Sequence, residues 1–375
     1  MNILILTGNF GGGHLKTSEA ILEHIKYRNL DYNVNILNLL DHVTHHFNKI
    51  ITSCYSEAAK RYPNIYGKFY YFAEEECLYH SVFGLMLKSL SIKYLPSIEE
   101  FEPHVIISNH PFTTGIVSHL KELGHLKNVK LINLLTDYAP HKYWIHENVD
   151  AYVTATEQMT DDMISRGVPK SIIHPIGIPI GVKFLNKYSK SNVFPSINFD
   201  ENRFTILLMS GSMGVEYVLK VFKSIILLEK EMQIIIVTGN NTYLYKKFEK
   251  LIRNFNNENI KFHLVGFTKD VDKFMSVSDV IITKPGGLTT TEAIFSQLPI
   301  VFFDGIPGQE EKNAEFILRN NIGMRISTSE ESLKNFKSLI DDEVKLNEIR
   351  KNILLVKKPR FMENLISLIE DLSKN

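Results

Sequence analysis

The stretch GNFGGGH, residues 8–14, places four glycines and a histidine directly after the first apolar run of the chain. Glycines in such a turn let a ligand approach the backbone closely, and the N-terminus of a following helix offers free N–H groups and partial positive charge. His14 can accept a proton near neutral pH, as a general base must. The spacing fits neither the P-loop nor the G-x-G-x-x-G motif. The turn therefore predicts either a binding loop of another kind or a tight turn capped by histidine.

A second candidate for the base is Asp137, in the stretch LLTDYAPHKYW, which also follows an apolar run. Its carboxylate could take a proton itself or orient a histidine, and a turn-forming aspartate is the alternative. His110, in SNHPF, and His141 are candidates for contact with a substrate. For both of these histidines a structural role is equally open.

Two glycine-rich turns in the second half of the chain carry hydroxyl groups. MSGSMG, residues 209–214, offers Ser210 and Ser212, and KPGGLTTTEA, residues 284–293, offers three threonines. Such turns can hold a diphosphate without a metal ion, because the terminus of the following helix supplies the compensating charge. Glu292, one turn into that helix, could accept hydrogen bonds from ribose hydroxyls, as acidic residues do in other nucleotide folds.

The stretch PGQEEKNAEF, residues 307–316, carries Gln309 and Glu310, whose side chains suit the recognition of sugar hydroxyls. A solvated helix start is the alternative, since Gln and Glu are common there. Asp270 and Asp272 match a D-x-D metal motif, but they precede an apolar-periodic segment. We therefore expect them to cap the N-terminus of a helix, and we expect no metal site.

Short apolar runs alternate with segments of helical period along the whole chain. Parallel sheets with helices on both faces give this alternation, so the sequence predicts the α/β class. In such sheets ligands bind beyond the carboxyl ends of the strands, where the turns described above lie. The predicted strands are 2–6, 34–39, 104–108, 130–135, 151–155, 204–209, 233–239, 260–266, 279–283 and 299–303, and the clearest helical segments are 215–229, 243–255 and 288–296.

The length of 375 residues predicts two domains, because single cores rarely grow to this size. The first set of strands gives a domain over residues 1–185, and the second set gives one over 203–340. The polar stretch 186–202 between them has the composition of a linker. Residues 341–375 are predicted to form C-terminal helices, the last with Phe361, Leu365, Leu368, Ile369 and Leu372 on one face.

Composition limits the partners. Lys and Arg number 42 and Asp and Glu number 42, so the zero net charge gives no general attraction to nucleic acid. Cys54 and Cys77 are too few for a disulfide framework, which favours a reducing compartment such as the cytoplasm. The segment 59–95 interleaves Lys and Arg with Tyr and Phe, as at a membrane interface, although a packed core explains the same stripe.

Four motifs in a fixed order resemble the diacylglycerol glycosyltransferases, over residues 1 to about 340. They are GGGH at 11–14, GSMG at 211–214, VGFTKDVDKFMSVSDVIITKPGGLTTTEA at 265–293, and PGQEEKNAEF at 307–316. This family comprises the bacterial processive diacylglycerol glucosyltransferases and the plant monogalactosyldiacylglycerol synthases, of glycosyltransferase family 28. The second half is also similar to the peptidoglycan N-acetylglucosaminyltransferase that acts on a lipid-linked precursor.

The resemblance implies a GT-B fold, in which two doubly wound Rossmann-like domains face each other across a cleft. The N-terminal domain would bind the acceptor and the C-terminal domain the UDP-sugar. His14 or Asp137 would be the base, and Gly12 and Gly13 would leave room for sugar and acceptor. By motif match, Gly211 and Ser212 would approach the diphosphate, Gly266 and Phe267 would frame the uracil, Gly287, Thr289 and Thr290 would hold the phosphates, Glu292 the ribose, and Gln309 and Glu310 the hexose.

One position departs from the family. An arginine often follows the G-[IL]-P-[IV] segment, whereas this chain has Gly181 there, with Lys183 nearby. The resemblance therefore assigns no arginine to the phosphate contact at this position.

The activity that the resemblance implies is inverting hexose transfer from a UDP-sugar to diacylglycerol or a glycosyldiacylglycerol, without metal or cofactor, giving a β-linked glycolipid. A composition rich in Lys, Asn and Ile is typical of AT-rich bacterial genomes and favours glucose over galactose. Because the acceptor lies in the bilayer, we expect a peripheral protein on the cytoplasmic face of the cell membrane. The alternatives are N-acetylglucosaminyl transfer to another lipid-linked acceptor, a UDP-sugar epimerase, and a non-catalytic UDP-sugar sensor.

Overall fold

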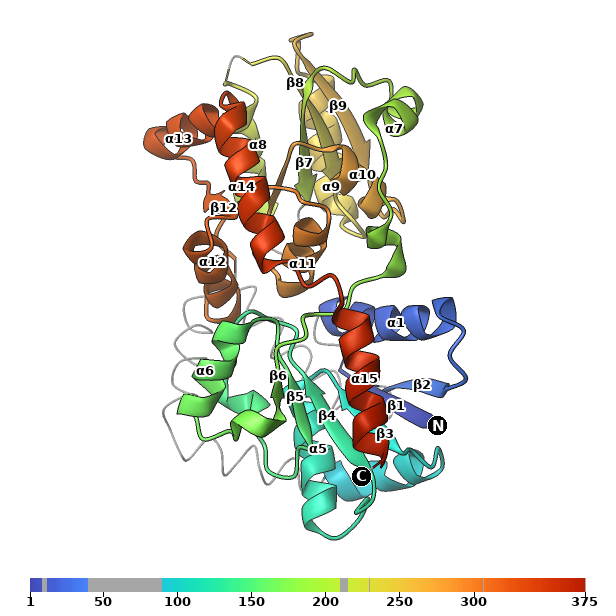
Figure 1. The fold of residues 1–375 in the computed structure, drawn as a ribbon. Coiled ribbons are helices and arrows are strands. Elements are labelled where there is room, and N and C mark those ends of the chain that lie inside the picture. The colour runs from blue at the N-terminus through green and yellow to red at the C-terminus, as the bar shows by residue number, and fades with distance from the viewer. Residues whose placement is uncertain (9–11, 40–89, 210–214, 229, 306, 375) are drawn as a thin grey trace. The chain divides into compact units, whose positions relative to one another are not determined.

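The computed structural model describes residues 1–8, 12–39, 90–209, 215–228, 230–305 and 307–374. The chain forms two compact units, each with its own parallel sheet (Figure 1). Unit 1 comprises residues 1–182, 307–309 and 358–375, and unit 2 comprises residues 183–306 and 310–357.

The sheet of unit 1 has six described strands in the order β2-β1-β3-β4-β5-β6, with every neighbouring pair parallel. Their apolar side chains are fully buried at the centre, where Ile3 to Leu6 and Val105 to Ile107 have no exposed surface. The strands are β1 (Asn2–Thr7), β2 (Asn33–Asn38), β3 (Val105–Ser108), β4 (Lys130–Leu134), β5 (Ala151–Val153) and β6 (Ile173–His174).

The described helices of unit 1 connect these strands, except for the last, which returns from the far end of the chain. It packs on α1, where Arg28 forms an ion pair with Glu363 at 2.8 Å and the His24 and Phe361 rings lie 5.1 Å apart. The helices are α1 (Gly12–Tyr27), residues 90–99, α5 (Pro111–Glu122), η2 (Lys142–Trp144), α6 (Glu157–Ser165), η3 (Lys170–Ile172) and α15 (Phe361–Lys374). A short 3-10 helix, η4 (Val182–Leu185), spans the boundary between the units.

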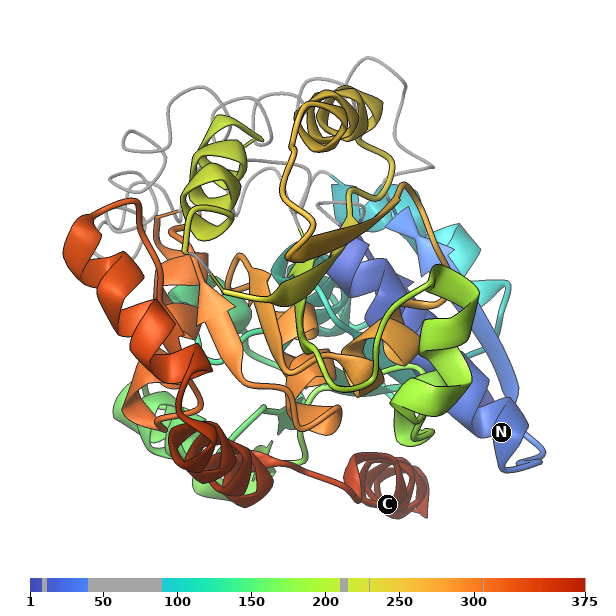
Figure 2. The ribbon, with the colours of Figure 1, turned by 90° about the horizontal axis from the view of Figure 1, so that it is seen from above.

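The described part of unit 2 holds a second six-stranded parallel sheet, in the order β12-β11-β10-β7-β8-β9. Helices α8 and α9 lie on one face of it, and α11 lies on the other (Figure 2). The strands are β7 (Phe204–Met209), β8 (Met232–Val237), β9 (Ile260–Val265), β10 (Val280–Thr283), β11 (Ile300–Phe302) and β12 (Gly323–Arg325). The helices are α7 (Lys190–Ile197), α8 (Val215–Ile225), α9 (Thr242–Arg253), α10 (Val271–Val277), α11 (Gly287–Phe295), α12 (Gln309–Arg319), α13 (Glu330–Ile340) and α14 (Glu343–Val356).

In each sheet the direction of strand progression reverses at one point. It reverses between β1 and β3 in unit 1, and between β7 and β10 in unit 2. Connections on either side of such a reversal pass over opposite faces of the sheet, which leaves a crevice at the carboxyl ends of the two central strands. The fold thus favours one ligand site in each unit.

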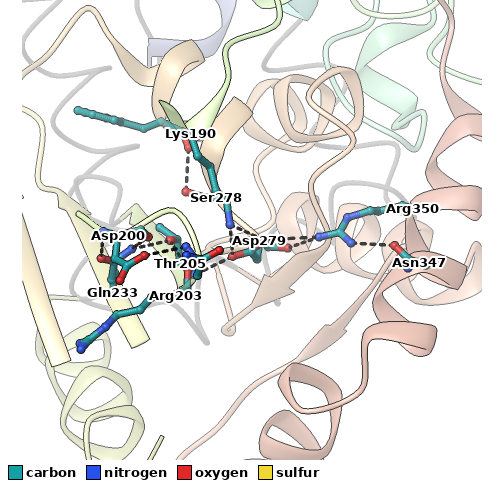
Figure 3. Close-up of polar contacts among 11 residues, drawn as sticks. Lys190, Asp200, Arg203, Thr205, Gln233, Ser278, Asp279, Asn347 and Arg350 are labelled. Carbon is teal, nitrogen blue, oxygen red and sulfur yellow. Dashed lines mark hydrogen bonds and ion pairs between the residues drawn. The ribbon is translucent and has the colours of Figure 1, made fainter. Parts of the chain in front are cut away.

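A polar network stabilises the amino ends of the strands in the unit 2 sheet (Figure 3). The Asp279 carboxylate, just before β10, accepts a hydrogen bond from the Thr205 backbone N–H at 2.7 Å. Lys190 of α7 forms an ion pair with this carboxylate at 3.1 Å, and Arg350 of α14 lies 3.9 Å from it. These charges therefore tie two helices to the amino ends of the strands, and their role is structural.

All ten predicted strands and the three predicted helical segments, which are α8, α9 and α11, are confirmed. Strands β6 and β12, of two and three residues, were not predicted. The polar stretch 186–202 contains α7, which its composition did not indicate. The predicted C-terminal helices are α14 and α15, and Phe361, Leu365, Leu368 and Ile369 are buried as expected.

Two expectations fall largely outside the described residues. Cys54 and Cys77 lie there, and so does the predicted membrane segment up to residue 89. The remainder of that segment is helical; Leu90 and Tyr94 are buried, whereas Ile92 is 51% exposed. Among the helices that the structure describes, none combines the length and apolar character needed to cross a membrane.

Candidate active site

The first candidate site lies at the reversal between β1 and β3. Helix α1 begins at Gly12, so His14 is its third residue, with 9% of its surface exposed. The imidazole does not cap the helix. Its Nδ1 atom lies 2.7 Å from the backbone oxygen of Asn109, in the turn that follows β3. The His14 ring therefore links the first turn of α1 to the turn after β3.

This contact fixes which ring nitrogen of His14 carries the proton. A carbonyl oxygen can only accept a hydrogen bond, so Nδ1 must be the protonated nitrogen, and Nε2 keeps its lone pair. The hydroxyl of Thr136, just beyond β4, lies 3.2 Å from the same Nδ1. Among the described residues, Nε2 has no hydrogen-bond partner. The neutral ring thus has a free basic nitrogen.

The surroundings of His14 hold the ring in its neutral form. Burial is the largest influence and lowers the pKa of His14 below its usual 6.5. The negative charge of Asp137 and the Asn109 carbonyl act in the opposite direction without reversing the shift. Asp137 is itself only 6% exposed. The structure therefore brings the two candidate bases into one electrostatic environment, with His14 neutral at neutral pH.

His110 and His141 each directly precede a helix and cap its N-terminus. The Nδ1 atom of His110 accepts a hydrogen bond from the Phe112 backbone N–H at the start of α5, and that of His141 accepts one from Tyr143 in η2. The rings of His110 and His14 lie 4.8 Å apart, edge to face. Burial, followed by the neighbouring His14, places the pKa of His110 well below its usual value. A capping role thus accounts for each histidine, and His110 also lines the His14 site.

The glycines of the first turn differ in their surroundings. A Cβ atom added at Gly12 would meet no other atom within 4 Å, and this residue is exposed. Gly13 is half-buried. Among the described residues, no atom fills the space beside Gly12, and room for a substrate at Gly12 and Gly13 stays a prediction.

The second candidate site lies at the reversal between β7 and β10. Helix α11 begins at Gly287, directly after the turn that follows β10, and the first N–H groups of a helix have no partner within it. The Thr291 hydroxyl donates to the Gly287 oxygen at 2.8 Å. Thr290 is fully buried, and its hydroxyl has no hydrogen-bond partner among the described residues. Thr289 and Glu292 are half-buried on the same helix.

A buried carboxylate stands beside this turn. Glu310 of α12 is 6% exposed and forms an ion pair with Lys284, which directly follows β10. A Cβ atom at Gly305 would lie 2.1 Å from a carboxylate oxygen of Glu310, so only glycine leaves space for this arrangement. Glu310 was predicted from the sequence and Lys284 was not, although the position of Lys284 directly after a strand was a usable signal. Gln309 is the first residue of α12.

The remaining predicted donor residues are partly described. Gly211 and Ser212 lie outside the described residues. Gly266 follows β9, and Phe267 next to it is 64% exposed. An exposed phenylalanine beside a glycine offers a flat apolar face for a planar ring.

The region around the D-x-D motif is a helix start, as predicted, but the expected side-chain cap is absent. Asp270 precedes α10 without a capping hydrogen bond and instead forms an ion pair with Lys273 at 2.7 Å. Asp272 is buried and lies 3.6 Å from the Lys183 ammonium, which donates to the Lys269 carbonyl at 2.9 Å. The Lys183 ammonium therefore already has two partners, Asp272 and the Lys269 carbonyl. Over the described residues, no group of three or more His, Cys, Asp or Glu side chains could hold a metal ion.

Comparison with solved structures identifies the fold. MurG from Acinetobacter baumannii matches with a TM-score of 0.62 at 12% identity, covering 99% of both chains. The UDP-GlcNAc 2-epimerase from Neisseria meningitidis matches with a TM-score of 0.60 at 13% identity, covering 100% of both. The predicted fold of two doubly wound domains, of GT-B type, is confirmed.

Comparison at the sequence level identifies the family. Residues 14–180 match the family described as monogalactosyldiacylglycerol (MGDG) synthase, and residues 205–358 match the glycosyltransferase family 28 C-terminal domain. The processive diacylglycerol beta-glucosyltransferase of Bacillus licheniformis is 28% identical over 94% of this chain and 90% of its own length. The protein of the same name from Staphylococcus carnosus is 30% identical over 99% of this chain and 94% of its own length. The predicted resemblance is thereby confirmed, and the chain belongs to the diacylglycerol glycosyltransferases of family 28.

Proposed function

We propose that this protein transfers glucose from UDP-glucose to diacylglycerol or a glycosyldiacylglycerol, inverting the anomeric carbon and using no metal ion. The observation that carries the proposal is the 30% identity with a processive diacylglycerol beta-glucosyltransferase over 99% of the chain, because it spans both units. The geometry of the two candidate sites supports the chemical steps.

His14 is the proposed base. The acceptor hydroxyl oxygen attacks C1 of the glucose from the face opposite UDP. The bond between C1 and the phosphate oxygen breaks, UDP leaves with the electron pair, and the hydroxyl proton passes to Nε2 of His14. Two observations support this role: the Asn109 carbonyl holds the proton of the neutral ring on Nδ1, and burial lowers the pKa of His14. Asp137 then stabilises the imidazolium that forms.

The N-terminus of α11 is the proposed diphosphate site. Its free N–H groups and partial positive charge oppose the charge that grows on UDP as it leaves. The buried Thr290 hydroxyl supports this assignment, since a buried polar group without a partner is destabilising by about 1–3 kcal/mol and a phosphate oxygen would satisfy it. Charge compensation by a helix terminus is the reason that we propose transfer without metal.

The other proposed donor contacts come from unit 2, except Gln309, which belongs to unit 1. The exposed Phe267 ring is the proposed stacking face for uracil, together with Gly266. Glu292 is the proposed ribose contact and Gln309 a proposed hexose contact. Glu310 would meet the hexose as a carboxylate held by Lys284. Gly211 and Ser212 are proposed to approach the diphosphate, as in the family motif.

Contact with a membrane follows from the acceptor, which does not leave the bilayer readily. We propose that the protein binds peripherally to the cytoplasmic face, with segment 59–95 as the docking region. The exposed Ile92 supports this, whereas the buried Leu90 and Tyr94 show that part of the stripe is core. No cofactor and no nucleic-acid partner are proposed.

Transfer of label to lipid tests the proposed function. Purified protein is incubated with diacylglycerol vesicles and labelled UDP-glucose or UDP-galactose in separate tubes, with and without EDTA, and the lipid phase is chromatographed. We expect label in lipid from UDP-glucose only, unchanged by EDTA. Absence of label from both donors would reject the acceptor, and a converted nucleotide sugar would instead support an epimerase.

Replacement of Asp137 distinguishes the two candidate bases. Asp137→Asn removes the negative charge that raises the pKa of His14, so this pKa falls further. Because the base must be neutral, we expect the acid limb of kcat/KM in wild type to lie below pH 6.5. In Asp137→Asn this limb should move to still lower pH. The plateau value of kcat/KM in this variant should fall by less than it does when the base itself is removed.

His14→Ala should lower kcat by about 100-fold or more. The matched control is His24→Ala, since His24 is buried in the same helix and its Nε2 atom contacts the Ile180 carbonyl at 2.9 Å. Complete loss of activity in Asp137→Asn, with His14→Ala retaining it, would assign the base to Asp137.

Replacement of Thr290 tests the diphosphate site. Thr290→Val keeps the shape and removes a hydroxyl that lacks a partner, so the free protein should be as stable as before or more so. UDP binding should weaken about tenfold, the value of a hydrogen bond to a charged group. Calorimetric titration with UDP measures the effect. Thr291→Val is the control, because that hydroxyl donates within its own helix; equal UDP affinity in wild type and Thr290→Val would remove Thr290 from the site.

A further inference from the structure

Asn109, which was not among the predicted site residues, contacts the candidate base His14. It directly follows β3, is fully buried, and its backbone N–H donates to the Leu6 carbonyl at the end of β1 at 3.2 Å. It therefore joins the two strands at the reversal point of the unit 1 sheet. In the sequence, Asn109 could have been noticed as a polar residue between the predicted strand 104–108 and His110.

Asn109 contacts His14 at both ends of that residue. The side-chain Nδ2 donates to the His14 backbone oxygen at 2.6 Å, and the Asn109 backbone oxygen accepts from the imidazole Nδ1 at 2.7 Å. The same Nδ2 donates to the Ser18 hydroxyl one turn further along α1, at 2.9 Å. One residue thus fixes both the first turn of the helix and the ring that this turn carries.

Stability alone does not account for an asparagine here. Its Oδ1 atom is buried and has no hydrogen-bond partner among the described residues, which is destabilising. An apolar side chain at this position would avoid the loss of stability that the unpaired Oδ1 atom causes. Its benefit lies in the hydrogen bond to the His14 main chain, which no apolar side chain could provide.

The hydrogen bond from the Asn109 amide to the His14 main chain makes possible the second one, from the His14 ring to the Asn109 carbonyl. The amide holds the first turn of α1 close to the turn after β3, and this closeness allows the Nδ1–H to reach the Asn109 carbonyl. If the turn shifts, that hydrogen bond is lost and the proton is free to occupy Nε2. The lone pair would then lie on Nδ1, which faces the protein rather than a substrate.

We propose that Asn109 is a positioning residue for the transfer reaction, its side-chain amide holding His14 in the Nδ1–H tautomer with Nε2 as the proton acceptor. This inference rests on the proposed function, in which His14 is the base. It does not make Asn109 a catalytic residue, because the side chain acts through His14 rather than on a substrate.

Nitrogen NMR tests the proposal directly. In protein labelled with ¹⁵N-histidine, the shifts of a ring show which nitrogen carries the proton, and the His14 signals are identified by their loss in His14→Gln. We expect wild type to show a single Nδ1–H tautomer. In Asn109→Ala we expect a substantial Nε2–H population, and we expect kcat for lipid glucosylation to fall about 10- to 100-fold with little change in KM for UDP-glucose.

Asn133→Ala is the matched control. Asn133 is also fully buried in the unit 1 sheet, and its Nδ2 atom donates to a backbone carbonyl, that of Trp144, at 2.6 Å. Its loss should reduce stability to a similar degree while leaving the His14 tautomer unchanged. Ser18→Ala, which removes only the second contact of the Asn109 amide, should also keep the wild-type tautomer.

A wild-type ring protonated on Nε2 would overturn the proposal, even if no variant folds. So would an Asn109→Ala protein that keeps both the Nδ1–H tautomer and full kcat. The NMR arm needs no substrate, so the tautomer result stands whether or not the protein glucosylates lipid. A fixed tautomer in wild type, lost in Asn109→Ala, together with no lipid labelling would reject the proposed function and keep the role of Asn109 in orienting His14.

Discussion

The reversal of strand progression in each sheet is the constraint on which both candidate sites depend. Parallel pairing aligns Leu6, Ser108 and Asn133 across β1, β3 and β4. The residues that follow these strands therefore meet at the carboxyl end of the sheet. His14 and Thr136 come together there although they are distant in sequence. Unit 2 repeats the arrangement around β7 and β10. Both candidate sites thus lie where a doubly wound sheet opens a crevice.

Burial gives the site in unit 1 its chemical character. An exposed histidine would be partly protonated near neutral pH, whereas burial disfavours the charged form of His14. A carboxylate in the same environment, Asp137, can then stabilise the charge once the proton arrives. In unit 2 the proposed compensation comes instead from backbone N–H groups at the start of α11. The proposed reaction therefore combines a neutral base in unit 1 with a partial positive charge from backbone N–H groups in unit 2.

Much of the fold was readable from the sequence, because buried parallel strands are continuous apolar runs. Strands β6 and β12 were missed since two or three residues give no such run, and α7 was missed because its sequence is polar. Among the candidate site residues, the glycine turns and His14 were predicted from their place after strands. Asn109 was not, because its contacts with His14 join residues 95 positions apart, and such contacts depend on strand order rather than on any local pattern.

The configuration of the transferred sugar tests the central claim most directly, which is a single displacement assisted by the neutral His14 ring. The glycolipid made from UDP-glucose, whose glucose is α-linked, is isolated and the one-bond coupling between C1 and its hydrogen is measured by NMR. The account predicts a β-glucoside, because attack opposite the leaving UDP inverts C1. An α-glucoside would contradict it, since retention requires either a second displacement or attack from the same face.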